Sequence, residues 1–79
     1  MKEHFKKMGF THFNQEGFDA FVKTYTGFRL FVATVPDSGN LLASIQIGTM
    51  EISIPNYITT EWVSDFDTEN ISLKKQLTN

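Results

Sequence analysis

In the middle of the chain, apolar residues alternate with polar ones, as expected for strands of an antiparallel sheet with one face in water. Residues 28–35 are rich in aromatic and β-branched side chains, and residues 41–47 and 50–54 alternate cleanly. The short segments between them, residues 36–40 and 48–49, contain residues that favour turns, such as Pro, Gly, Asp and Asn. The pattern therefore predicts a three-stranded antiparallel meander.

The segment before the meander favours a helix over about residues 15–26. Its apolar side chains recur at the three- and four-residue spacing of one helical face. Asn14 is a good N-cap, and Gly27 is a good residue at which to end a helix. A strand over residues 18–26 is the alternative, because aromatic and β-branched residues favour strands and Gly17 is a poor helix residue.

The segment after the meander also favours a helix, over about residues 57–66. Ile58, Trp62 and Phe66 are spaced four residues apart and would share one helical face. The tail, residues 67–79, alternates as a strand would but also fits a helical turn. We assign this tail to a helix.

The first residues, 2–8, fit a short helix that ends at Gly9, with frayed coil as the alternative. A length of 79 residues allows one domain. We therefore expect a single α+β domain over residues 1–79, with the helices from both ends of the chain packed on one face of the sheet.

The composition adds constraints on stability and location. The chain has no cysteine, so no disulfide can brace the fold, and eight phenylalanines, two tyrosines and one tryptophan must supply the core. The lack of cysteine agrees with a cytoplasmic protein. No apolar segment follows the basic N-terminus, and no apolar run approaches the ~20 residues of a bilayer-spanning helix. We therefore expect no signal peptide and no membrane association.

The charges are unevenly distributed, although the formal net charge is only −2. Residues 30–73 contain six acidic residues and neither Lys nor Arg. Four of these acids lie close together in the sequence and form a candidate surface for a basic partner: Glu61, Asp65, Asp67 and Glu69. Five of the seven basic residues precede them and are the candidates for phosphate contacts: Lys2, Lys6, Lys7, Lys23 and Arg29.

Motifs for catalysis and metal binding are absent from the sequence. It has no glycine-rich phosphate loop, no Cys nucleophile and no serine in a nucleophile-elbow context. His4 and His12 are the only histidines, whereas a zinc site needs three or four ligands. The acids of residues 65–69 match the start of a calcium loop, but Asn70 and Gln76 occupy the positions that require Gly and Glu. We predict no catalytic residues, no metal and no cofactor, and therefore a protein that is not an enzyme.

The first strand of the expected meander differs from the others because both of its faces are apolar. Phe31 and Val35 point away from the face that would join the core. We expect Trp62 and Phe66, from the C-terminal helix, to cover them. The alternative is an interface with a partner or a second copy, which makes Phe31, Val35 and Trp62 the candidate apolar binding residues.

These patterns favour a small interaction protein that is an inhibitor, adaptor or regulator. It would bind a larger protein partner through the acidic surface, the apolar surface or both. Small accessory proteins of phages and mobile elements often have sequences of this kind, and a homodimer is a further option. A nucleic-acid-binding module that uses the basic N-terminal residues is the alternative function. Binding that weakens steeply with salt would distinguish it from apolar docking.

Overall fold

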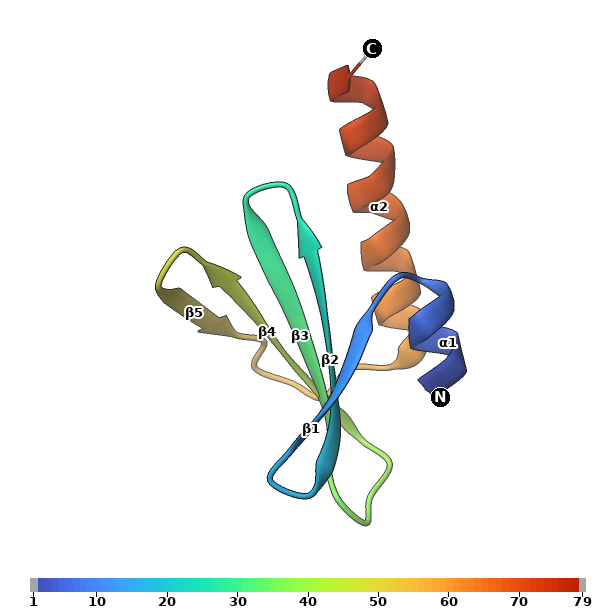
Figure 1. The fold of residues 1–79 in the computed structure, drawn as a ribbon, viewed down its shortest axis with the longest axis vertical. Coiled ribbons are helices and arrows are strands. Elements are labelled where there is room, and N and C mark those ends of the chain that lie inside the picture. Colours follow the sequence, from blue (N-terminus) through green and yellow to red (C-terminus); the bar gives the residue numbers. More distant parts are fainter. Residues whose placement is uncertain (1, 79) are drawn as a thin grey trace.

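The structure is a computed structural model that describes the backbone of residues 2–78 and the side chains of residues 2–71. Its elements in chain order are α1 (Lys2–Lys7), β1 (Thr11–Gln15), β2 (Phe18–Tyr25), β3 (Phe28–Thr34), β4 (Leu41–Ile47), β5 (Met50–Ser53) and α2 (Thr60–Thr78). The five strands form one antiparallel sheet in chain order (Figure 1). The expected α+β class, with a helix near each end of the chain, is confirmed. The sheet is larger than predicted: it has five strands, whereas three were expected.

The helix predicted over residues 15–26 is wrong, because this segment is part of a β-hairpin. Gln15 of β1 pairs with Phe18 of β2, which leaves Glu16 and Gly17 as a two-residue turn. Both turn residues have positive φ angles, 52° and 90°. A turn of this kind twists in the same sense as its strands and therefore favours a hairpin. The alternative strand over residues 18–26 is the better description.

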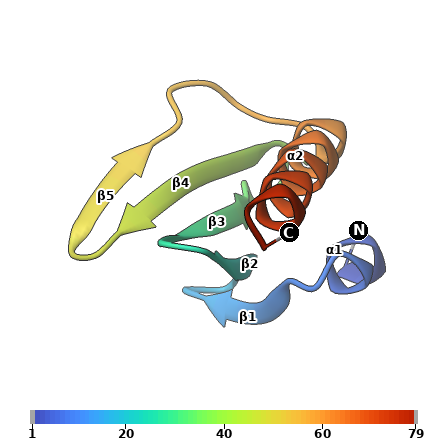
Figure 2. The same ribbon diagram turned by 90° about the horizontal axis from the view of Figure 1, so that it is seen from above.

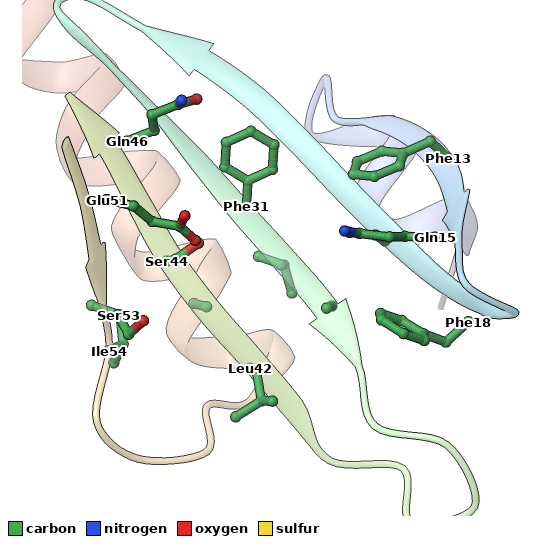
Figure 3. Close-up of a pocket in the computed structure, with 14 residues that line it drawn as sticks. Phe13, Gln15, Phe18, Phe31, Leu42, Ser44, Gln46, Glu51, Ser53 and Ile54 are labelled. Atoms are coloured by element: carbon green, nitrogen blue, oxygen red, sulfur yellow. The ribbon is translucent and has the colours of Figure 1, made fainter. Parts of the chain in front are cut away.

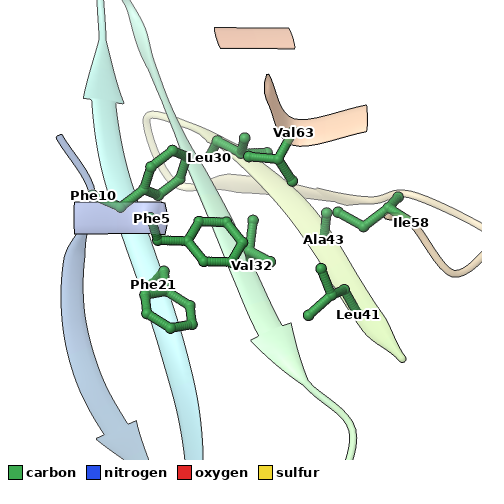
Figure 4. Close-up of a cluster of buried hydrophobic side chains, with 9 residues drawn as sticks. All are labelled: Phe5, Phe10, Phe21, Leu30, Val32, Leu41, Ala43, Ile58 and Val63. Carbon is green, nitrogen blue, oxygen red and sulfur yellow. The ribbon is translucent and has the colours of Figure 1, made fainter. Parts of the chain in front are cut away.

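The two helices pack on one face of the sheet, which we call the helix face (Figure 2). A cluster of buried apolar side chains from the sheet, the helices and the loops forms the core there: Phe5, Phe10, Phe21, Leu30, Val32, Leu41, Ala43, Ile58 and Val63 (Figure 4). Phe5 explains how a helix as short as α1 is held. Its ring is fully buried, stacks on Phe21 at 4.3 Å between centroids, and meets Phe10 edge-on at 5.3 Å.

The C-terminal helix begins later than predicted and includes the tail. Thr59 caps it, because its Oγ1 accepts a hydrogen bond from the backbone N–H of Trp62 at 3.0 Å. The helix then continues through the tail, as we had assigned it, to Thr78. The acids of residues 65–69 are therefore helical and do not form the loop that a calcium site requires.

Candidate functional site

The face of the sheet opposite α1 and α2, which we call the open face, has a hollow. Strand pairing aligns a row of residues across this face, from Phe13 through Ala20 and Ala33 to Leu42. The two alanines in the middle are small, whereas the residues at both ends are large, so the row forms a floor with a wall at each end. Phe31 of β3 borders the same space, and the hollow measures about 430 Å³ (Figure 3).

The hollow has an aromatic side and a polar side. Phe13, Phe18 and Phe31 supply the aromatic side from β1, β2 and β3, and the rings of Phe13 and Phe31 meet edge-on at 6.5 Å between centroids. The polar side comes from four residues of β4 and β5: Ser44, Gln46, Glu51 and Ser53. A surface of this kind can accept an apolar element and fix its orientation through hydrogen bonds at one side.

The expectation that Trp62 and Phe66 cover Phe31 is wrong. Trp62 stacks on Phe66 at 5.3 Å, and Phe66 meets Phe28 edge-on at 6.0 Å, so both lie on the helix face. Alternation along β3 sends Phe31 to the other side of the sheet. Val35 follows the end of β3 and is half-buried. The three candidate apolar residues therefore do not form one site, because the sheet separates Trp62 from Phe31.

The candidate acidic residues are divided in a similar way by the faces of α2. Glu61, Asp65 and Glu69 are spaced four residues apart and are all exposed, so they form an acidic stripe along the outer side of the helix. Asp67 points inward and is only 6% exposed. It belongs to the interior of the protein, and three of the four predicted acids remain available to a partner.

A buried ion pair accounts for the position of Asp67. Its Oδ1 accepts hydrogen bonds from the Lys23 ammonium at 2.5 Å and from the Tyr25 hydroxyl at 2.7 Å. Lys23 also donates to the carbonyl oxygen of Met8. Burial, together with the hydrogen bond and the negative charge of Asp67, raises the pKa of Tyr25 well above its ordinary value. These contacts tie α2 to β2 and to the end of α1.

The five candidate cations for nucleic acid do not share one surface. Lys23 is paired inside the protein with Asp67, and Lys2 lies 3.7 Å from Asp19. Lys6 and Lys7 are exposed on α1 on the helix side, whereas Arg29 is exposed on β3. Arg29 is paired in the sheet with Gln46, a residue of the hollow, so it points to the open face. Phosphates would meet positive charge on two opposite sides of the sheet.

The histidines and the hollow are also on different faces. His12 Nε2 lies 2.7 Å from Asp19 Oδ1, and His4 Nε2 lies 3.1 Å from Ser64 Oγ on α2. The contacts with His12 and Lys2 lower the pKa of Asp19, the hydrogen bond from His12 being the larger cause.

Among the described residues that line the hollow, Glu51 is the single ionisable one. In the described part of the chain, no three His, Cys, Asp or Glu side chains are grouped so that they could hold a metal.

Sequence reasoning missed most of the residues that line the hollow. Phe18 lies within the segment predicted as a helix, and Phe13 lies just before it. Leu42 is an apolar residue on the otherwise polar side of the strand at residues 41–47. The sequence did contain a signal for the β1–β2 hairpin. Gly17 lies between two segments in which alternate residues could share one face of a sheet, as in two strands joined by a tight turn.

Comparison of the chain with protein-family models, with curated proteins and with solved structures gives no match. Neither helix, over the residues that the structure describes, has the length and apolar character needed to cross a bilayer.

Proposed function

We propose that this chain is a non-enzymatic protein-binding module, an inhibitor, adaptor or regulator, that docks on a larger protein through the open face. The observation that carries the proposal is the uncovered aromatic hollow formed by Phe13, Phe18, Phe31 and Leu42. Among the described elements, no helix lies on this side of the sheet (Figure 2). Sheets of two-layered domains normally bury an apolar face, so an aromatic face without a covering layer favours a binding surface.

An amphipathic helix of the partner is the occupant that fits this face. A helix lying on the open face would add the layer that α1 and α2 already supply on the opposite face. Its apolar stripe would lie over Phe13 and Phe31, and its polar flank would face Ser44, Gln46 and Glu51. The acidic stripe of Glu61, Asp65 and Glu69 lies on the other side of the molecule and offers a second contact to a basic region of the same partner.

The arrangement of side chains also favours a protein without catalytic activity. Ser44 and Ser53 have hydroxyl groups in the hollow, but both histidines lie on the helix face and cannot act as their base. Among the described residues that line the hollow, Glu51 has no second ionisable group beside it, which paired acid–base chemistry needs.

Affinity purification from the source cell tests this proposal. The baits are the unchanged protein, the variant Leu42→Glu and the control variant Tyr57→Glu. Leu42 is 45% exposed in the hollow, and Tyr57 is 60% exposed in the loop before α2. We expect the unchanged protein and the control Tyr57→Glu to retain the same partner, and Leu42→Glu to lose it. Because the main contact is apolar, we expect the partner to remain bound at salt concentrations that screen the contact with the acidic stripe. The proposal is refuted if Leu42→Glu retains the partner as well as the control does, or if the retained species is DNA or RNA released steeply by salt.

A further inference from the structure

Strand β5 forms one margin of the sheet, and its outer edge is unpaired. In Figures 1 and 2, no other described segment runs along the outer side of β5, because the loop after it turns inward toward α2. All four residues of β5 are exposed. Natural proteins often protect such an edge with Lys, Pro, a bulge, a charged side chain or a very short strand. The strand Met50–Ser53 is short and carries Glu51, but it contains neither Lys nor Pro.

The backbone groups that point outward from β5 can be assigned from its pairing with β4. The N–H of Ile54 donates to the carbonyl oxygen of Ala43 at 2.9 Å, so Ile54 directs its backbone groups toward β4. These directions alternate along an antiparallel strand. Ile52 therefore also faces β4, whereas Glu51 and Ser53 direct their N–H and C=O groups away from the sheet. The edge thus presents two donors and two acceptors.

The side chains above this edge are apolar. Met50 and Ile52 are 58% and 44% exposed, and Ile47, which pairs with Met50, is 45% exposed. All three lie on the same side of the sheet as the core, beyond the part that α2 covers. An edge with free backbone groups and an exposed apolar row is suited to the addition of another strand.

We propose that the strand added at this edge is β5 of a second copy of this chain, in antiparallel pairing about a two-fold axis at Ile52. In this register Glu51 lies opposite Ser53 of the second copy. Each residue donates its N–H to the carbonyl oxygen of the other, which gives two hydrogen bonds on each side of the axis. Ile52 then lies opposite Ile52 of the second copy, and Met50 lies opposite Ile54 of the second copy.

Self-pairing in the neighbouring registers is less favourable. A two-fold axis at Glu51 would place two like charges directly opposite each other, which destabilises a sheet. An axis at Ser53 would place Glu51 opposite Pro55, which has no N–H to donate. A shift by a single residue would set polar side chains against apolar ones on both faces. The sequence of β5 is therefore self-complementary in one register, which is the property that a symmetric interface requires.

This dimer would be weak and would extend the proposed docking surface. Two four-residue strands bury less than the ~1,000 Å² typical of stable interfaces, so we expect a dissociation constant on the order of 10–100 µM. Because the two-fold axis runs perpendicular to the sheet, both open faces lie on the same side. The dimer would present two hollows side by side and would bind two helices, or one partner twice.

Sedimentation equilibrium over a concentration range from about 1 µM to 1 mM tests the dimer, with Ile52→Lys and Leu42→Lys as matched variants. The two residues have nearly equal exposures, 44% and 45%, but Leu42 lies on the open face and away from the edge. We expect the average mass of the unchanged protein to rise from one chain toward two. Leu42→Lys should behave in the same way, whereas Ile52→Lys should weaken association at least about 100-fold, because it sets two cations face to face.

A backbone variant separates strand pairing from simple apolar contact. Ser53→Pro removes an outward N–H that β4 does not use, so the fold should persist while association is lost. In the unchanged protein, amide exchange of Glu51 and Ser53 should slow as the concentration rises. A protein that remains a monomer at 1 mM, or equal association by Ile52→Lys and Leu42→Lys, would overturn the proposal. Loss of partner binding in Leu42→Lys alone concerns the open face and leaves the dimer intact.

Discussion

The buried ion pair between Lys23 and Asp67 should be the most sensitive polar contact in the fold. Asp67 is 6% exposed, and the Lys23 side chain is 18% exposed. Replacing Asp67 with Leu removes the negative charge and leaves the Lys23 ammonium with the carbonyl oxygen of Met8 as its remaining hydrogen-bond acceptor in the described structure. The same change leaves the Tyr25 hydroxyl without its acceptor.

The expected loss follows from this geometry. Breaking a buried ion pair by removing one partner costs about 3–5 kcal/mol, because the other charge stays buried without compensation. The faces of Tyr25 and Phe10, 5.3 and 6.0 Å from Lys23 Nζ, recover only part of this through cation–π attraction. A domain of this size has a total stability on the order of 5–8 kcal/mol, so Asp67→Leu should leave it close to unfolding in water.

Urea unfolding followed by circular dichroism measures the effect. With a slope of about 1–1.5 kcal/mol per molar urea, the midpoint should fall by about 2–5 M. The double variant Lys23→Met with Asp67→Leu removes both charges and should regain at least about 2 kcal/mol over Asp67→Leu alone. The reasoning is refuted if the single variant loses less than about 1 kcal/mol, or if the double variant is less stable than Asp67→Leu.

Three further changes probe other parts of the fold. Phe5→Ala should cost about 3–5 kcal/mol in urea unfolding and expose the amides of α1 to exchange, because Phe5 is fully buried. Glu16→Asn should raise the stability by about 0.5–1 kcal/mol, since Asn followed by Gly17 suits a turn with two positive φ angles. Asp19 has a lowered pKa, so its contribution is present above pH about 4 and is lost as the pH falls through the folded value. Melting temperatures measured from pH 6 to 2 should therefore fall less steeply in Asp19→Asn than in the unchanged protein.

The strands that were predicted correctly, β4 and β5, are those in which apolar and polar side chains alternate with a clear period of two. Residues 41–47 alternate apolar and polar side chains and form β4 with the predicted bounds, Leu41–Ile47. Residues 50–54 alternate in the same way, and β5 covers most of them. In both strands apolar residues occupy one face and polar residues most of the other, so the pattern has a clear period of two.

The β1–β2 hairpin was missed because β2 is apolar on both faces. Phe21 and Tyr25 point to the helix face, while Phe18 and Val22 point to the open face. Taken together, these four positions reproduce the spacing of a helical stripe, and a strand that is apolar on both faces loses its period of two. The decisive local feature was Gly17, which a helix tolerates poorly and a hairpin turn needs.

The candidate site could be predicted only in part for a similar reason. The two-sided apolar character of β3 correctly identified Phe31 as facing away from the core, but the sequence does not say on which side of the sheet α2 packs. Asp67 could have been separated from the other acids, because it lies four residues after Val63, which is fully buried on the same helix. Glu61, Asp65 and Glu69 lie on the opposite side of that helix.

Both proposed binding surfaces arise from one property of this fold. The two helices cover one face of the five-stranded sheet, so the opposite face and the β5 edge remain without a neighbouring layer among the described residues. These surfaces are independent, because the hollow uses side chains of one face, whereas the edge uses backbone groups and the apolar row of Met50 and Ile52. A partner helix on the open face therefore need not compete with β5 pairing. If Leu42→Glu abolishes partner binding and Ile52→Lys abolishes only self-association, the two surfaces act separately. If Ile52→Lys also weakens partner binding, the partner engages both hollows of the dimer.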